Sequence, residues 1–239
     1  MFQPHGWELI RQVATIEELN AASTALHAAT LARCSTGSGA AFMPVSELWR
    51  VDEACRAFTF NPRYAAIAAR LLGCARVRLY HDQAMFTEPG GASTPWHQDA
   101  QHWAVPGDRC LTMWMPLVDL TADMGTLTYA SGSQRDGLRG DWPISPASQT
   151  HFSEMVRRND WPVINAGAMA AGDALFHDGF VLHGAPANTT ARLREVMTVL
   201  YVADDARLIE PQWPAQAAAL AQWSPGQQPG ESYVGPLIS

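Results

Sequence analysis

The sequence predicts a mainly β domain of the sandwich or barrel type, with α-helices packed outside it. Ala- and Leu-rich helical segments fill the first third of the chain, and after residue 74 short runs rich in Val, Leu, Thr, Tyr and Phe alternate with turn clusters. No linker or internal repeat interrupts the 239 residues, a length that one β domain often reaches. We therefore expect a single domain with a helical part over 1–74, a β core over about 75–205 and an extension over 206–239.

Two helices are marked by their end signals. The motif "TIEE" at residues 15–18 has the form of a capping box and precedes an Ala- and Leu-rich run that ends near Cys34. Asn61 is the expected cap of the second helix, Pro62 occupies its first position and Gly73 stops it.

The β core is expected to begin directly after the second helix. Its strands are predicted over residues 76–88, 95–99, 109–117, 125–130, 174–176, 181–183 and 194–203. Residues 138–169 contain three prolines and are predicted to be an irregular insertion of the kind that covers a site. A short helix over 211–223 and an exposed ending complete the chain.

Composition limits the partners. Apolar residues make up 47% and charged residues 16% of the chain, which predicts a globular protein. The net charge is −7, and no arginine cluster is longer than a pair, which argues against nucleic-acid binding. The chain has no signal-peptide pattern and no apolar run of membrane-spanning length, so we expect a cytoplasmic protein without a membrane partner. Its four cysteines lack a C-x-x-C spacing and are expected to be free thiols.

The stretch "TPWHQDAQHW" at residues 94–103 contains the first candidate metal ligands. Residues two apart in a strand share a face, so His97 and Asp99 can bind one ion. Alone, the pair is equally consistent with a loop histidine bonded to an aspartate. His183, at the end of a later apolar run, adds a second imidazole. Two histidines and one carboxylate are the protein ligands of non-haem Fe(II) centres with open coordination positions.

Arg194 opens an otherwise apolar strand. Burying a guanidinium without a partner is costly, and its fork matches a carboxylate in a bidentate manner. Arg194 therefore suits the distal carboxylate of 2-oxoglutarate, the co-reductant that oxygen chemistry at Fe(II) requires.

Four segments carry a resemblance to a known family: "YHDQAMFTEPGGASTPWHQDAQHW", "LTMWMPLVDLTADMGTLTYASGSQ", "AGDALFHDGFVLHGAPANTTARLR" and "AQWSPGQQPGE". Together they resemble the phytanoyl-CoA dioxygenase family of Fe(II)/2-oxoglutarate-dependent oxygenases, over roughly residues 61–229. The resemblance implies a double-stranded β-helix, which is a cupin-like jelly-roll barrel, with flanking helices. It also implies three cofactors and cosubstrates: Fe(II), 2-oxoglutarate and O2.

The resemblance places the catalytic metal ligands at His97, Asp99 and His183, and the 2-oxoglutarate arginine at Arg194. A carboxylate at the position of Asp99 excludes halogenation, because halogenases of this type leave that position free for chloride. The reactions that remain possible are hydroxylation, ring closure and desaturation, each of which begins at a C–H bond of the substrate.

Further cosubstrate contacts are implied at Trp114 and, through the "HDQ" segment, at Gln83. Two positions depart from the family pattern. Thr87 stands where relatives often have a lysine, and Ala185 stands where a serine can follow the second histidine. Binding of 2-oxoglutarate is therefore expected to depend more strongly on Arg194.

Substrate contacts are expected at His102, Trp103 and Trp142, because histidine and tryptophan suit a polar or sugar-containing ring. His102 is not expected to bind the metal, since the open positions must stay free for oxygen. The adjacent pairs 81–82 and 177–178 also combine histidine and aspartate, but neighbours in a strand face opposite sides and are not expected to chelate.

The sequence thus favours an oxygenase of bacterial secondary metabolism acting on a small molecule. Two alternatives remain. A redox-inert cupin-like isomerase or hydrolase would need another general base and leaves Arg194 without a role. A non-catalytic jelly-roll binding protein would not need the metal ligands.

Overall fold

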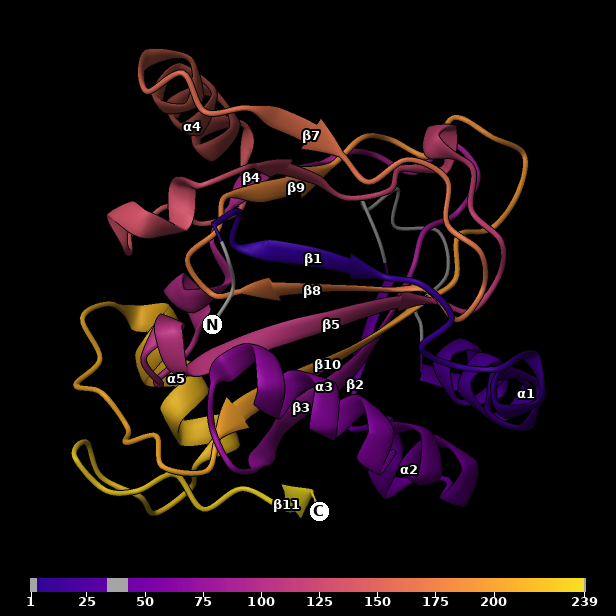
Figure 1. Cartoon of the computed structure of the whole chain (residues 1–239), viewed down its shortest axis with the longest axis horizontal. Coiled ribbons are helices and arrows are strands. Elements are labelled where there is room, and N and C mark those ends of the chain that lie inside the picture. The colour runs from indigo at the N-terminus through magenta and orange to yellow at the C-terminus, as the bar shows by residue number, and fades with distance from the viewer. Residues whose placement is uncertain (1–3, 34–42, 239) are drawn as a thin grey trace.

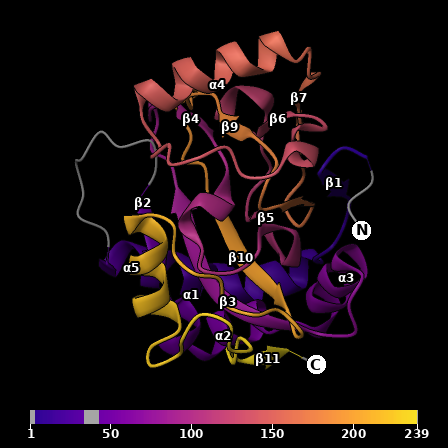
Figure 2. The ribbon, with the colours of Figure 1, turned by 90° about the vertical axis from the view of Figure 1, so that its left-hand side faces the viewer.

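The computed structural model describes residues 4–33 and 43–238, which form two antiparallel β-sheets with helices outside (Figures 1 and 2). This confirms the predicted mainly β fold. The helices are α1 (Ile16–Arg33), α2 (Glu53–Thr59), α3 (Pro62–Leu72), α4 (Pro146–Arg158) and α5 (Pro214–Trp223). The strands are β1 (Trp7–Ile10), β2 (Met43–Ser46), β3 (Val77–Phe86), β4 (Thr94–His97), β5 (Cys110–Pro116), β6 (Thr128–Ala130), β7 (Val163–Asn165), β8 (Ala174–Asp178), β9 (His183–Ala185), β10 (Val196–Ala203) and β11 (Leu237–Ile238).

The larger sheet has the order β1-β8-β5-β10-β3-β11, with β2 pairing to another part of β3. The smaller sheet has the order β4-β9-β6-β7. Because side chains alternate along a strand, each strand of the larger sheet has one face toward the smaller sheet and one toward the helices. The two sheets pack as the layers of a jelly roll.

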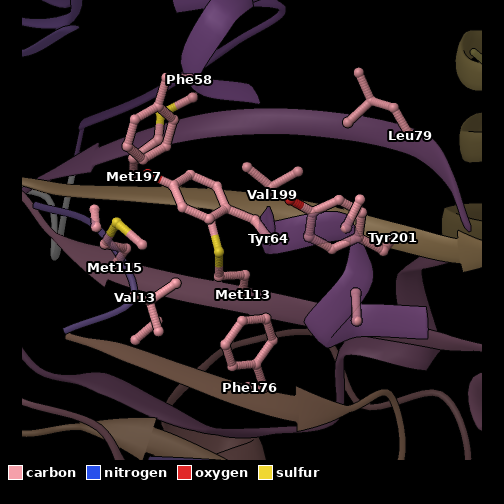
Figure 3. Packing of buried hydrophobic residues seen from close by; sticks show 14 of the residues in the cluster. Val13, Phe58, Tyr64, Leu79, Met113, Met115, Phe176, Met197, Val199 and Tyr201 are labelled. Carbon is pink, nitrogen blue, oxygen red and sulfur yellow. The ribbon is translucent and has the colours of Figure 1, made fainter. Parts of the chain in front are cut away.

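The main apolar core lies between the outer face of the larger sheet and helices α1 to α3 (Figure 3). Met113, Phe176 and Val199 project from three adjacent strands toward Tyr64 of α3 and Phe58 of α2. Each fully buried side chain of this size contributes roughly 1.5–3 kcal/mol to folding. The inner face of the larger sheet, which points toward the smaller sheet, lines a cavity instead.

The predicted helix signals are confirmed. The Thr15 hydroxyl accepts from the Glu18 backbone N–H (3.3 Å), and the Glu18 carboxylate accepts from the Thr15 N–H (2.8 Å), which is a capping box. The Asn61 side chain accepts from the Arg63 N–H (3.0 Å). Gly73 ends α3 with φ of 65°, in the left-handed region that favours glycine.

Several boundaries differ from the prediction. Residues 1–74 are not only helical, since they also supply β1 and β2. These strands have four residues each, too few to show a clear alternation. Residues 138–169 are more regular than expected and contain α4 and β7. The strand predicted over 181–183 instead begins at His183, because Asp178 holds the preceding turn by accepting from the backbone N–H groups of Phe180 and Val181.

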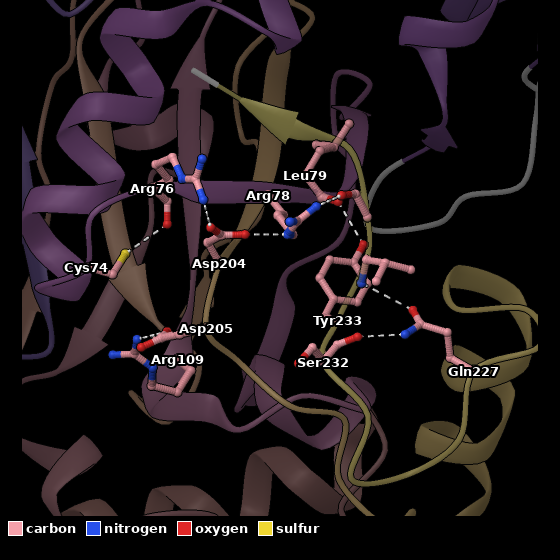
Figure 4. Close-up of polar contacts among 12 residues, drawn as sticks. Cys74, Arg76, Arg78, Leu79, Arg109, Asp204, Asp205, Gln227, Ser232 and Tyr233 are labelled. Carbon is pink, nitrogen blue, oxygen red and sulfur yellow. Dashed lines mark hydrogen bonds and ion pairs between the residues drawn. The ribbon is translucent and has the colours of Figure 1, made fainter.

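Most residues of the chain after α5 are exposed, as expected, but this segment also docks on β3. Tyr233 is buried and donates to the Leu79 carbonyl oxygen (2.7 Å), while β11 pairs with β3 (Figure 4). Asp204 ties the same region together by accepting from Arg76 and Arg78, each at 2.6 Å. Trp223 of α5 packs beside Tyr80 of β3, with the ring centres 6.3 Å apart.

Cys55, Cys74 and Cys110 are free thiols, as predicted, and Cys34 lies outside the described residues. Over residues 4–33 and 43–238, none of the helices combines the length and the apolar character needed to cross a bilayer.

Candidate metal centre and cosubstrate pocket

A cavity of about 300 Å³ lies between the two sheets. The inward positions of both sheets line it, with additional side chains from the loops and from α5. Those from the larger sheet are Ser46, His81, Gln83, Met85, Thr112, Trp114, His177, Thr198 and Leu200, and those from the smaller sheet are Thr94, His97, His183 and Ala185. This cavity contains the candidate functional site.

His97, Asp99 and His183 meet at one end of the cavity. His97 ends β4 and lies opposite His183, the first residue of β9. The ligand atoms of the three residues all lie within 4.8 Å of one another. Oδ1 of Asp99 is 3.5 Å from Nε2 of His97 and 3.6 Å from Nε2 of His183. The structure therefore brings together the three residues that the sequence singled out.

The expectation that Asp99 belongs to a strand is wrong. β4 ends at His97, and Asp99 begins a 3₁₀ turn, η2 (Asp99–His102). The turn, rather than strand alternation, directs the carboxylate toward the histidines.

Backbone carbonyl groups orient both imidazoles. Nδ1 of His97 lies 2.8 Å from the Pro95 oxygen, and Nδ1 of His183 lies 3.1 Å from the Val181 oxygen. A carbonyl oxygen only accepts, so each Nδ1 donates and each Nε2 keeps a free lone pair. Burial, together with the neighbouring His97, holds the pKa of His183 well below its ordinary value. The free lone pair on each Nε2 is the group that binds a metal ion.

The second oxygen of Asp99 is bound by two side chains of the larger sheet. Its Oδ2 accepts from Oγ1 of Thr112 (2.8 Å) and lies 3.2 Å from Nε2 of His177. Nδ1 of His177 lies 3.0 Å from the hydroxyl group of Tyr129. Burial opposes ionisation of Asp99, but His183 and His177 outweigh it and hold the pKa of Asp99 well below its ordinary value. The carboxylate is ionised, with Oδ1 free toward the metal position.

His177 is a site residue that the sequence interpretation missed. The sequence interpretation took it only as half of an adjacent pair with Asp178, whose side chains face opposite sides of a strand. A usable signal was present: extending the predicted strand 174–176 by one residue places His177 on the same face as Leu175. In the structure His177 is the cross-strand partner of Thr112, and both contact Asp99.

Arg194 also lines this cavity, and only 3% of its surface is exposed. Its guanidinium donates to the Gly125 carbonyl oxygen and to the Thr87 hydroxyl (2.6 Å), while Nε has no partner. Within the described part of the chain no carboxylate pairs with it. Burial lowers the pKa of Arg194 to about 10, so it remains a cation at neutral pH. A buried, unpaired cation in a cavity is suited to an anionic ligand.

Glycine is required beside Arg194. Gly125 has φ of 84°, and a Cβ there would lie 2.4 Å from the Pro186 oxygen and 2.9 Å from Nη1 of Arg194. A side chain at this position would displace the guanidinium.

The other predicted contact residues divide into two groups. Trp114, Gln83, Ala185, His102 and Trp103 line the cavity, and the Trp114 ring centre is 6.0 Å from the Arg194 guanidinium carbon. Nε2 of Gln83 donates to the Ser46 hydroxyl (3.2 Å).

Trp142 does not line the cavity, and the expected substrate contact is not supported. Its ring stacks on His151 at 3.8 Å between ring centres and packs beside Phe152 of α4. Trp223 of α5, which the sequence interpretation did not consider for the substrate, lines the cavity instead.

The donor set fits iron. Two imidazole nitrogens, from β4 and β9 of the smaller sheet, and one carboxylate oxygen from the turn η2 converge on one point, and this is the ligand set of the non-haem Fe(II) oxygenases. The unpaired Nε of Arg194 in the same cavity fits a 2-oxo acid whose second carboxylate reaches the guanidinium.

Comparison with known proteins identifies the family. The family model described as phytanoyl-CoA dioxygenase (PhyH) matches residues 2–196, and the chain belongs to this family. The 2-aminoethylphosphonate dioxygenase of uncultured bacterium HF130_AEPn_1 is 27% identical over 124 residues, 52% of this chain and 45% of that protein. The ectoine dioxygenase of Stutzerimonas stutzeri (strain A1501) is 24% identical over 168 residues, 59% of this chain and 55% of that protein. The chain thus spans about half the length of the curated relatives it matches.

Solved structures share the fold over nearly their whole length. The non-haem α-ketoglutarate-dependent carbocyclase SnoK from nogalamycin biosynthesis has a TM-score of 0.81 at 23% identity and covers 100% of this chain and 94% of its own. The epimerase SnoN, solved with Fe3+, α-ketoglutarate and nogalamycin RO, has a TM-score of 0.79 at 22% identity, covering 100% and 96%. These likenesses confirm the jelly-roll fold.

Proposed function

We propose that this protein is an Fe(II)- and 2-oxoglutarate-dependent oxygenase that oxidises an unactivated C–H bond of a small molecule. One observation carries the proposal: the same cavity is lined by the three metal-ligand side chains and by Arg194, whose guanidinium has no carboxylate partner and whose Nε has no hydrogen-bond partner. Family membership supports it. The redox-inert alternative leaves Arg194 without a ligand, and the binding-protein alternative leaves the oriented imidazoles without a role.

His97, Asp99 and His183 would hold Fe(II) through two Nε2 atoms and Oδ1. Bound iron would supply the redox centre at which O2 is reduced, with 2-oxoglutarate as co-reductant that leaves as succinate and CO2. Three protein ligands leave positions for the cosubstrate and for oxygen.

Arg194 would bind the distal carboxylate of 2-oxoglutarate, and Trp114 would form a flat wall beside it. The Thr87 hydroxyl and the Gly125 carbonyl group hold the guanidinium in place before the ligand arrives. Because its partners are prearranged, less conformational entropy is lost on binding. Gln83 lies farther along the wall and is proposed to contact the cosubstrate or the substrate.

We further propose a role in bacterial secondary metabolism, with hydroxylation or oxidative ring closure as the outcome. The fold shared with SnoK and SnoN of nogalamycin biosynthesis supports this proposal. The small-molecule substrate and the cytoplasmic location remain parts of the proposal.

The test is an anaerobic titration of the metal-free protein with Fe(II) and 2-oxoglutarate, monitored by the visible metal-to-ligand charge-transfer band. The wild-type protein should form the band, Arg194→Ala should need at least tenfold more 2-oxoglutarate, and His183→Ala should form none. Arg192→Ala is the matched control, because Arg192 is exposed and does not line the cavity. Absence of the band in the wild type, or an unchanged titration for Arg194→Ala, would refute the assignment.

A further inference from the structure

The cavity wall also contains four residues that take no part in the proposed metal and cosubstrate contacts: His81, His102, Trp103 and Trp223. These residues come from β3, the turn η2 and the residue after it, and α5. The His81 ring packs against the Trp223 ring, and His102 directly precedes Trp103 in the chain. We call this part of the cavity wall the distal subsite.

The distal subsite has no permanent charge of its own. Among the described lining residues, only Asp99 and Arg194 carry one. In the proposed function the metal neutralises Asp99, and 2-oxoglutarate neutralises Arg194. The inference therefore rests on the proposed function.

The two histidines of the distal subsite are neutral. Burial lowers the pKa of His81 to about 4, and burial with the nearby His97 lowers the pKa of His102. Nδ1 of His81 and Nε2 of His102 are buried without a hydrogen-bond partner. A neutral imidazole offers one donor and one acceptor. The unpaired nitrogen of each ring takes one of these two roles, and a hydroxyl group, which both donates and accepts, can pair with either.

Aromatic faces supply the rest of the wall. The Trp223 ring lies 4.9 Å from the His81 ring at an interplanar angle of 33°, and Trp103 is 6% exposed. Flat aromatic walls favour the face of a ring over a flexible chain. Trp223 also connects the pocket to the C-terminal extension, which docks on β3 through Tyr233 and β11.

We propose that the distal subsite binds the substrate as an uncharged ring that carries hydroxyl groups, such as a neutral sugar ring. A carboxylate or an ammonium group on that ring enters a cavity without a counter-ion and loses its hydration. The subsite therefore selects against charged analogues of the same shape.

The test compares three probes that share a nitrophenyl aglycone: 4-nitrophenyl β-D-glucopyranoside, the corresponding glucuronide, and the corresponding 2-amino-2-deoxyglucoside. Calorimetric titration uses the anaerobic protein loaded with Fe(II) and 2-oxoglutarate. We expect the neutral glucoside to bind at least tenfold more tightly than either charged probe. Equal or tighter binding of a charged probe, or no saturable binding of the glucoside, overturns the proposal.

Variants locate the binding. Trp223→Ala and His81→Phe should each weaken glucoside binding at least fivefold, whereas Trp142→Ala, a tryptophan outside the cavity, should not. Wild-type affinity in both subsite variants overturns the proposal. The charge-transfer band of the same sample, recorded before the probe is added, reports separately on the proposed function. A sample that forms the band but prefers the glucuronide retains the oxygenase proposal and refutes the neutral subsite.

Discussion

Nε2 of His177 lies 3.2 Å from Oδ2 of Asp99, the carboxylate oxygen that faces away from the two histidine ligands. His177 in turn contacts the Tyr129 hydroxyl through Nδ1. Because an ionised carboxylate only accepts, Nε2–H of His177 donates to Asp99. The chain of bonds leaves Oδ1 as the oxygen available to a metal.

We predict that His177→Phe weakens metal binding, because Asp99 loses one of the two donors that orient it. Removing such an outer partner typically costs about 10- to 100-fold in metal affinity. Titration with Co(II), followed by its absorption, measures this without turnover. His177→Gln, which keeps a donor, should recover part of the affinity, and His151→Phe, which changes a histidine outside the cavity, should have no effect. An unchanged Kd for His177→Phe would show that Thr112 alone orients Asp99.

We predict that Thr87→Val raises the Kd of 2-oxoglutarate by about tenfold, the effect of losing a hydrogen bond to a charged group. The substitution preserves shape but removes the oxygen that accepts from Arg194 at 2.6 Å. Thr198→Val is the matched control, since Thr198 lines the same cavity and donates to the Gln83 carbonyl oxygen instead. Equal effects of the two variants would argue against a specific role of Thr87.

We predict that Tyr233→Phe lowers the free energy of unfolding by about 1 kcal/mol, because it leaves the buried Leu79 carbonyl without its donor. Tyr201→Phe should cause no loss, because the buried Tyr201 hydroxyl has no hydrogen-bond partner. Urea denaturation of both variants measures the difference. A similar loss in both would mean that the tail hydrogen bond does not matter for stability.

We predict a pH dependence that originates at Asp178. Burial raises the pKa of Asp178 to about 7, although the Phe180 and Val181 backbone N–H groups oppose the shift. The folded protein therefore keeps a proton that the unfolded chain has already released near pH 4, and the free energy of unfolding falls as the pH rises toward 7. Between pH 5 and 8 this amounts to roughly 3 kcal/mol.

Asp178→Asn should remove this fall in the free energy of unfolding. The amide oxygen of asparagine still accepts from both backbone N–H groups, but the amide group does not ionise. Denaturant unfolding of the metal-free protein at pH 5 and pH 8 measures it. Asp123→Asn, which changes an exposed carboxyl group, should keep the wild-type difference. The same difference in Asp178→Asn as in the wild type would contradict the assignment.

The class of fold and the candidate metal ligands could be predicted from the amino-acid sequence alone. Local signals were sufficient where one segment contains all the interacting groups: the capping box at Thr15, the cap at Asn61 and the left-handed stop at Gly73 all lie where expected. His97, Asp99, His183 and Arg194 could be predicted because Fe(II) binding and 2-oxoglutarate binding require these residue types.

Other residues of the cavity could not be predicted, because they meet only in the folded chain. His177, Trp223 and His81 reach the cavity because strand register, the docking of β11 and the fold of the tail bring distant segments together. Trp142 has the same chemistry as Trp223 but packs against α4 instead. Strand register depends on which strands pair, a long-range choice, so a histidine within an apolar run does not reveal which face it takes until its partner strand is known.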